Sequence, residues 1–205
     1  KPFFWFVSFT SPHTPFNVSQ RYWDLYNHND IDLPAVPEVP FAELDYLSKA
    51  LFFAHGRHRH SVTNNHRLNA RHAYYAMISY LDEKLGQLIE QLEETGLRDN
   101  TVVVFTSDHG EMMGERGMWF KQCFWEWSAR VPLVISDRRT TQATRIQSNC
   151  SLVDLLPTFV ALAGGGDGPL APAISEMAGH SLVPLLSGET GQWSDCVIAD
   201  YLAIG

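Results

Sequence analysis

The segment Ser107-Asp108-His109-Gly110-Glu111 carries side chains whose types and spacing suit metal binding. It follows a valine-rich run at residues 101–106, which predicts a strand that ends just before it. An aspartate followed by a histidine at a strand end can supply one oxygen and one nitrogen ligand to a divalent cation. Gly110 would allow the backbone to turn tightly beside them. The alternative is a polar turn in which Asp108 only caps the backbone.

Further candidate residues lie outside that segment. His13 directly follows the apolar run at residues 3–9, which is a second predicted strand end. Lys121 lies among aromatic residues, where it either binds an anion or lays its stem on apolar surface with its ammonium group in water. Trp119 and Trp125 would contact the substrate if it carried a quaternary ammonium group, and would otherwise belong to the core.

Several histidines lie close together between residues 55 and 72, which raises the possibility of a zinc site. Their spacing matches no zinc-finger pattern, no cysteine lies near them, and the arginines in the same stretch would repel a cation. We therefore interpret this stretch as a polar loop and keep only His60 as a further site candidate.

Local patterns predict the elements that must position these residues. Apolar runs predict buried strands at residues 3–9, 101–106 and 131–135. Residues 41–53 and 152–163 predict helices, and the second of these should end at a glycine- and proline-rich loop over residues 164–173. A longer helix is indicated by apolar residues in steps of three and four, with Gly96 as its end: Tyr74, Ile78, Leu81, Leu85, Leu88 and Leu92.

Strands that alternate with helices indicate an α/β fold with a largely parallel sheet. In such a sheet, ligands bind where the strands end at their carboxyl edge. We therefore expect His13, Asp108, His109 and Lys121 to converge at one edge of the sheet, although they are far apart in the sequence.

The composition excludes several classes of protein. A chain of 205 residues, 19% charged and 12% aromatic, is long enough for one globular domain and is not intrinsically disordered. A net charge of −8 makes it a poor nucleic-acid binder, because that affinity comes largely from lysine and arginine. No apolar run is long enough to span a membrane. The three cysteines, Cys123, Cys150 and Cys196, form no disulfide or zinc pattern, which favours a reducing compartment such as the cytoplasm.

Both ends of the sequence suggest a piece of a larger domain. The chain opens on the strand-like run at residues 3–9, with no signal peptide before it, and closes on another such run at residues 197–202. Natural domains seldom begin and end inside core strands. We therefore expect residues 1–205 to form a single domain that is incomplete at both ends.

Five motifs together resemble the sulfatase branch of the alkaline-phosphatase-like superfamily. In chain order they are SFTSPHTPF, TVVVFTSDHGEMMGERGMWFK, RVPLVIS, SLVDLLPTFVALAG and AGHSLVPLLSG. They extend over the whole chain, and the second is the most specific. Within the family, the chain resembles the choline sulfatases most. The resemblance implies a mainly parallel sheet sandwiched by helices, of which residues 1–205 would be the middle and C-terminal portion of the catalytic domain.

The resemblance also implies a role for each candidate residue. Asp108 and His109 match the metal-ligating pair of the family, which holds a divalent cation such as calcium. Lys121 matches the sulfate-binding lysine, and His13 matches a histidine that can protonate the leaving oxygen. A divalent cation and an ammonium group suit a transferring sulfuryl group, because both stabilise the negative charge that develops on its oxygens.

The chain departs from the family pattern in important places. Sulfatases use a formylglycine made from the first residue of C/S-x-P-x-R, and that motif does not occur in these 205 residues. The nucleophile is therefore expected outside this chain, as are the first acidic metal ligands. Asp200 or Ile204 falls where a carboxylate facing a substrate ammonium would be expected.

The function that the resemblance implies is hydrolysis of choline-O-sulfate to choline and sulfate. The enzyme would act on a small-molecule sulfate ester, would bind neither nucleic acid nor membrane, and would form a homo-oligomer. One alternative is a phosphonate monoester or phosphodiester hydrolase of the same superfamily. Another is a non-catalytic fragment that binds a metal or an anion. The 205-residue chain by itself is expected to be inactive.

Overall fold

The structure is a computed structural model that describes residues 2–140, 143–165, 172–173, 176–189, 191 and 193–200. These residues belong to two compact units, Lys1–Arg139 and Thr140–Gly205. Within the described residues, no helix is both long enough and apolar enough to cross a membrane.

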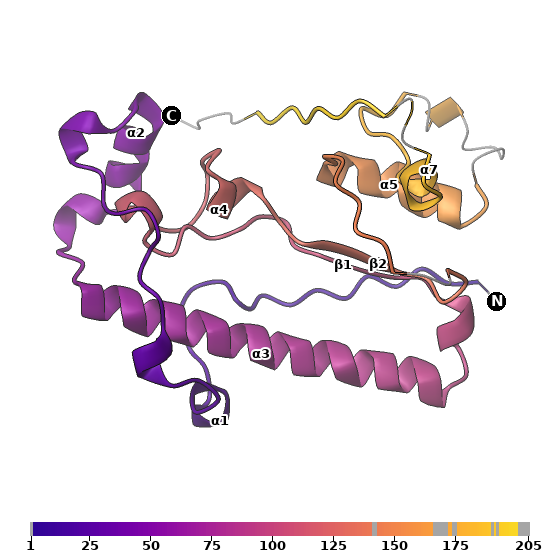
Figure 1. Cartoon of the computed structure of the whole chain (residues 1–205), viewed down its shortest axis with the longest axis horizontal. Coiled ribbons are helices and arrows are strands. Elements are labelled where there is room, and N and C mark those ends of the chain that lie inside the picture. Colours follow the sequence, from indigo (N-terminus) through magenta and orange to yellow (C-terminus); the bar gives the residue numbers. More distant parts are fainter. Residues whose placement is uncertain are drawn as a thin grey trace. The chain divides into compact units, whose positions relative to one another are not determined.

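The first unit contains one long helix and one two-stranded sheet (Figure 1). The long helix is α3 (Asn64–Glu94), and the strands are β1 (Val103–Thr106) and β2 (Leu133–Ser136). The remaining helices are α1 (Gln20–Trp23), α2 (Tyr46–Ala54) and α4 (Glu126–Ala129). Short 3-10 turns complete the unit: η1 (His28–Asp30), η2 (Phe41–Glu43), η3 (Arg57–Arg59), η4 (Arg98–Asn100) and η5 (Glu115–Gly117).

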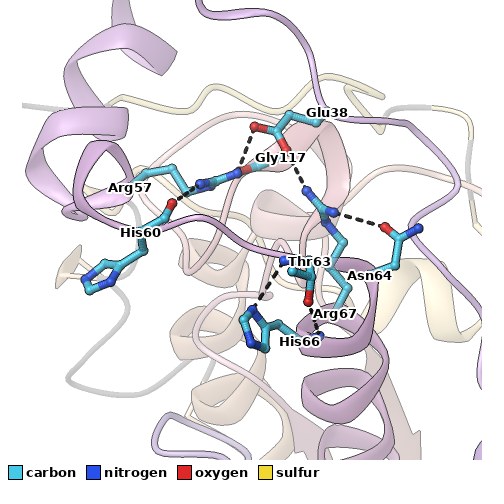
Figure 2. A network of polar contacts seen from close by, with 8 residues as sticks. All are labelled: Glu38, Arg57, His60, Thr63, Asn64, His66, Arg67 and Gly117. Atoms are coloured by element: carbon cyan, nitrogen blue, oxygen red, sulfur yellow. Dashed lines mark hydrogen bonds and ion pairs between the residues drawn. The ribbon is translucent and has the colours of Figure 1, made fainter.

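Helix α3 confirms the helix predicted from the apolar periodicity, and it begins well before Tyr74. At its first turn, Thr63 Oγ1 accepts a hydrogen bond from His66 N at 3.3 Å, and His66 Nδ1 accepts one from Thr63 N at 3.2 Å (Figure 2). At its other end, Gly96 has a φ of 68°, the left-handed conformation predicted for it. These two reciprocal bonds form a capping box, which supplies hydrogen-bond partners for backbone amides of the first turn. The helix therefore begins at Asn64, before the apolar repeat from which it was predicted.

The histidine-rich stretch is not simply a loop, so that interpretation is wrong in part. His66 lies in the first turn of α3, and His72 lies inside the helix with 1% of its surface exposed. His72 stacks on Trp23 with 3.6 Å between ring centroids, and its Nε2 lies 2.9 Å from Trp23 O. A histidine can be buried in a helix when a carbonyl accepts its N–H group in this way.

Strands β1 and β2 form where the sequence predicts them, but they pair antiparallel, with Val103 opposite Ser136. The expected parallel arrangement is therefore wrong for this pair. Parallel strands need a long crossover, usually a helix, whereas the segment between these strands contains only the short η5 and α4. The strands are also not buried on both faces, since Phe105 is 39% and Val134 56% exposed.

Residues 3–9 do not form the predicted buried strand. The structure has no strand there, and the large side chains are exposed, from 41% for Phe9 to 77% for Phe6. An apolar strand is buried only where neighbouring strands and helices cover it, and the described residues contain a sheet of only two strands. The prediction failed because the pattern of a segment does not reveal whether its partners are present.

The second unit contains η6 (Leu152–Asp154), α5 (Leu155–Leu162) and α7 (Val183–Leu186). The first two confirm the helix predicted at residues 152–163. Buried Asp154 accepts hydrogen bonds from Ser151 N at 2.7 Å and His180 N at 2.8 Å, which connect the start of the helix to the segment before α7. Residues 197–200 hold no strand. Residues 166–171 of the predicted loop, and Tyr201, Leu202 and Ile204, lie outside the described residues.

Candidate active site

The segment at residues 107–123 carries most of the candidate residues and folds back on itself. Met112 N donates to Phe120 O at 2.8 Å, and Gly114 N donates to Met118 O at 2.9 Å. Beneath these bonds, a buried cluster joins the segment to α2: Leu51, Met112, Met118 and Cys123. The fold-back brings Lys121 to the same region as Asp108 and His109, although they lie at opposite ends of the segment.

Lys121 and His13 are in direct contact. Their Nζ and Nε2 atoms lie 2.7 Å apart, although 108 residues separate them in the sequence. His13 Nδ1 lies 2.7 Å from Thr14 O, which can only accept a hydrogen bond. Nδ1 therefore carries the proton, and Nε2 accepts a hydrogen bond from the Lys121 ammonium group.

His109 and Asp108 lie beside this pair. The ring centroids of His13 and His109 are 6.5 Å apart, in an edge-to-face arrangement. His109 Nδ1 is 2.8 Å from Gly110 O, so it donates its proton there, and His109 Nε2 lies 3.6 Å from Asp108 Oδ2. The structure thus brings the four predicted residues together just beyond the end of β1. His13, however, follows exposed chain rather than a strand.

Asp108 and His109 suit two of the ligands of a divalent cation. The side chain of Asp108 is 84% exposed. Because His109 donates from Nδ1 to Gly110 O, the lone pair of its Nε2 atom can bind a metal. Within the described residues, no group of three or more histidine, cysteine, aspartate or glutamate side chains could hold a metal ion. A calcium-type site takes about six to eight ligands, so the others would have to come from elsewhere.

Gly110 is required because of close packing, not because of the tight turn that we expected. A Cβ atom at this position would lie 2.0 Å from Trp127 O, and Gly110 N donates to Ser128 O at 2.8 Å. The backbone of the Asp108–His109 loop therefore lies directly against the segment that leads into β2. Only glycine allows this approach.

Glu111 is a site residue that the sequence reasoning named in the loop but gave no role. Its Oε1 accepts a hydrogen bond from Phe120 N at 2.5 Å and another from Met113 N at 3.4 Å. Burial raises the pKa of the Glu111 carboxyl, against the opposing effect of these two amides and of the positive charge of Lys121. The spacing of the motif could not show that this half-buried carboxyl bonds the amide next to a candidate lysine.

Trp119 and Trp125, the predicted substrate-binding aromatics, lie in different surroundings. The Trp125 ring is covered by the guanidinium group of Arg116, whose Cζ lies 3.8 Å from the ring centroid, and it packs on the buried Leu51 cluster. Trp119 has a buried indole N–H without a hydrogen-bond partner among the described residues. Their role in substrate binding stays a prediction.

A cavity of about 210 Å³ lies between α2 and residues 116–120, which directly precede Lys121. It is lined largely by apolar side chains, among them Phe52, Trp119 and Phe120, and His60 also borders it. His13, Asp108, His109 and Lys121 do not line it. His60 is held in the polar network around Glu38, where its carbonyl accepts from Arg57 at 2.7 Å (Figure 2). It is not part of the Lys121 cluster.

Arg57 and Arg67 both form ion pairs with Glu38 in that network (Figure 2). The distances are 2.7 Å from Arg57 Nη2 to Oε1 and 2.5 Å from Arg67 Nη2 to Oε2.

Asp200, the candidate partner of a substrate ammonium, belongs to the second unit. Its alternative, Ile204, lies outside the described residues.

Comparisons with known proteins identify relatives of this chain. The chain is 39% identical to a choline-sulfatase of Rhizobium meliloti (strain 1021) over 96% of its own length and 37% of that protein. It is 33% identical to a multifunctional alkaline phosphatase superfamily protein of Trinickia caryophylli, over 94% of the chain and 39% of that protein. The chain thus spans well under half the length of these curated relatives.

A solved structure with a similar fold is the phosphonate monoester hydrolase from Silicibacter pomeroyi. It superposes with a TM-score of 0.72 at 27% identity and covers 89% of this chain, whereas the chain covers 37% of that protein. The fold is therefore the α/β fold of the alkaline-phosphatase-like enzymes. The sulfatase family model matches residues 1–165, most of the chain, and the chain belongs to the sulfatase family.

Proposed function

We propose that the protein containing this chain is a sulfuric ester hydrolase that acts on choline-O-sulfate. The contact of Lys121 Nζ with His13 Nε2, beside the Asp108–His109 pair, is the observation that carries the reaction class. The similarity to the Rhizobium choline-sulfatase supports the choice of substrate. A sulfate monoester is an anion, and a partly exposed ammonium group beside a histidine is suited to bind it.

Lys121 binds the sulfuryl group in this proposal. Its ammonium group has three donors, of which one is directed at His13, so the others can contact sulfuryl oxygens. His13 Nε2 faces the same position. Once protonated, this nitrogen can donate its proton to the choline oxygen as the nucleophile bonds to sulfur and the S–O bond breaks, so that choline leaves with a neutral hydroxyl group rather than as an alkoxide.

Asp108 Oδ2 and His109 Nε2 would hold a divalent cation, which we propose to be calcium. When bound, the cation would neutralise part of the negative charge on the sulfuryl oxygens. We propose that the nucleophile is a formylglycine outside these residues, because neither Cys123, Cys150 nor Cys196 begins the C-x-P-x-R motif.

We also propose that the complete enzyme is a homo-oligomer in the cytoplasm, and that residues 1–205 form part of one catalytic domain. The cytoplasmic location is supported by the cysteines, which are free thiols: Cys150 and Cys196 are exposed and Cys123 is buried. The homo-oligomer and the domain assignment rest on the family resemblance alone.

Hydrolysis of a phosphonate monoester is the second candidate function. Its support is the superposition on the Silicibacter phosphonate monoester hydrolase. The same lysine, histidine and metal ligands suit a phosphonate anion as well as a sulfate, because both present negatively charged oxygens.

The test compares kcat/KM of the full-length protein for choline-O-sulfate, an uncharged isostere of it, an aryl sulfate and a phosphonate monoester. We expect choline-O-sulfate to be preferred, since an aromatic face contributes about 0.5–2 kcal/mol to binding a trimethylammonium group. Lys121→Ala should lower kcat/KM by about 10²–10³-fold, the typical loss on removal of one donor to a developing anion.

The matched control is Lys84→Ala, which removes another lysine of the same unit. Lys84 lies on α3, where its ammonium group donates to Gln87 at 3.1 Å, and its removal should leave kcat/KM unchanged. Preference for the phosphonate monoester would favour the second candidate. Equal kcat/KM for choline-O-sulfate and its uncharged isostere would exclude a cationic substrate.

A further inference from the structure

The backbone on both sides of Lys121 is in an uncommon conformation. Phe120 has a φ of 64° and Gln122 a φ of 77°. In the described part of the chain, every non-glycine residue with positive φ lies between Met113 and Gln122. The left-handed region costs on the order of 1 kcal/mol or more for such residues, and it persists only where the surrounding structure enforces it.

Two hydrogen bonds from one short segment fix the peptide groups of Phe120. Glu111 Oε1 accepts from Phe120 N at 2.5 Å, and Met112 N donates to Phe120 O at 2.8 Å. On the C-terminal side of Lys121, Gln122 Oε1 lies 2.8 Å from His55 Nε2. Of these contacts, the bond to Glu111 is the one made by an acidic side chain, which is half-buried and whose pKa is affected by the charge of Lys121.

We infer that Glu111 is a positioning residue for Lys121. Its carboxylate holds the Phe120 amide, keeps the backbone in the left-handed conformation and so directs Lys121 Nζ at His13. This inference rests on the proposed function, in which Lys121 binds the substrate anion. Because Glu111 lies two residues after His109, one short loop carries the candidate metal ligands and also sets the place of the anion-binding lysine.

Another role is conceivable for the same side chain: a buried anchor that only stabilises the fold. Glu115 shows what such an anchor looks like. It is 1% exposed and accepts hydrogen bonds from Ala35 N at 3.0 Å and Val36 N at 2.8 Å. In the described part of the chain, it makes no hydrogen bond or ion pair with Lys121 or with its neighbours Phe120 and Gln122. Glu115 therefore provides a matched control for a change at Glu111.

The test uses two substitutions of Glu111 in the full-length protein. Glu111→Gln keeps an oxygen acceptor at the same reach and removes the charge, whereas Glu111→Asp keeps the charge and withdraws the acceptor by one methylene. We expect Glu111→Asp to lower kcat by about 100-fold with a smaller change in KM, the loss typical of a catalytic group misplaced by about 1 Å. Glu111→Gln should stay within about tenfold of the wild type.

A double-mutant cycle with Lys121→Ala decides whether Glu111 acts through the lysine. If it does, Glu111→Asp causes no further loss in the Lys121→Ala background. The dissociation constant of inorganic sulfate, measured by calorimetry, should show the same non-additivity without any turnover. Glu115→Asp should lower thermal stability and be additive with Lys121→Ala.

Additive effects of Glu111→Asp and Lys121→Ala would overturn the inference, as would a loss with Glu111→Gln as large as that with Glu111→Asp. If the wild type hydrolyses phosphonate monoesters and no sulfate ester, the proposed function fails by itself. The cycle is then measured with the phosphonate substrate and with inorganic phosphate, and the inference on Glu111 is accepted or rejected on that result.

Discussion

The contact between Lys121 and His13 determines where the positive charge of the site lies. His13 Nδ1 donates to Thr14 O, and its Nε2 accepts from Lys121 Nζ. An ammonium group at this position suits the oxygens of a sulfuryl group, and the imidazole beside it faces the same place. The two side chains therefore form one unit of function.

Gly110 offers a test of how tightly the loop with the proposed metal ligands Asp108 and His109 is held. Gly110→Ala places a Cβ atom 2.0 Å from Trp127 O, so the loop with Asp108 and His109 has to move. We expect the calcium affinity of the full-length protein to fall by about 10–100-fold, the range found when the support of metal ligands is lost. Isothermal titration with calcium measures it.

Gly86→Ala is the control for that change. Gly86 lies within α3, and a Cβ atom there would meet nothing within 4 Å. The substitution should leave the calcium affinity unchanged and stabilise the helix by up to about 1 kcal/mol. Wild-type calcium binding by Gly110→Ala would show that the loop does not need its close approach to Trp127.

Helix α2 packs against the segment that carries the site, since its Leu51 belongs to the same buried cluster as Met112, Met118 and Cys123 of that segment. Asp45 caps this helix: Oδ1 accepts from Ser48 N at 2.9 Å and Oδ2 from the Ser48 hydroxyl at 2.6 Å. Burial by itself would raise the pKa of Asp45, but these hydrogen bonds outweigh it and hold the pKa below its usual value.

Asp45→Ala should therefore loosen α2. Loss of an N-cap costs about 1 kcal/mol, so amide hydrogen exchange in α2 should become about fivefold faster in the full-length protein at pH 7. In the wild type, the contribution of the cap is complete above the unfolded-state pKa of about 3.9 and is lost as pH falls through the lower folded-state pKa.

The control is Asp82→Ala, because Asp82 is an exposed acidic residue on α3. It should leave exchange in α2 unchanged. Equal protection of α2 in the wild type and Asp45→Ala at pH 7 would mean that packing of Leu51, and not the cap, sets the stability of the helix.

At the scale of the whole molecule, the chain carries only part of the proposed catalytic apparatus. It supplies Lys121, His13 and two potential metal ligands, and it spans 37% of the length of the Rhizobium choline-sulfatase. The exposed apolar side chains of residues 3–9 are consistent with this, since such a cluster is typical of a surface that other segments cover.

We predict that the purified 205-residue chain has no sulfatase turnover and only weak calcium affinity. Covalent catalysis needs an activated nucleophile, and no formylglycine motif is present in these residues. The measurement is a choline-O-sulfate and aryl-sulfate assay with calcium and without it, with Lys121→Ala as the background. Calcium-dependent turnover clearly above that background would show that the reaction needs fewer residues than we propose.

The sequence by itself predicted the helices α2, α3 and α5, the positions of two strands and the candidate residues of the site. Helix α3 follows from apolar spacing and from a glycine at its end, and β1 and β2 follow from β-branched runs, because these signals are local. The sulfatase motifs identified Asp108, His109, Lys121 and His13 for the same reason, since each lies in a short segment of characteristic residues.

Only the tertiary structure decided how these segments meet. It placed Lys121 Nζ on His13, joined Glu111 to the Phe120 amide and covered the Trp125 ring with Arg116. It also decided the antiparallel pairing of β1 with β2 and the exposure of residues 3–9. Each of these features depends on how the chain folds back on itself or on partners distant in the sequence, and a local pattern carries no information about which partner a side chain or a strand will find.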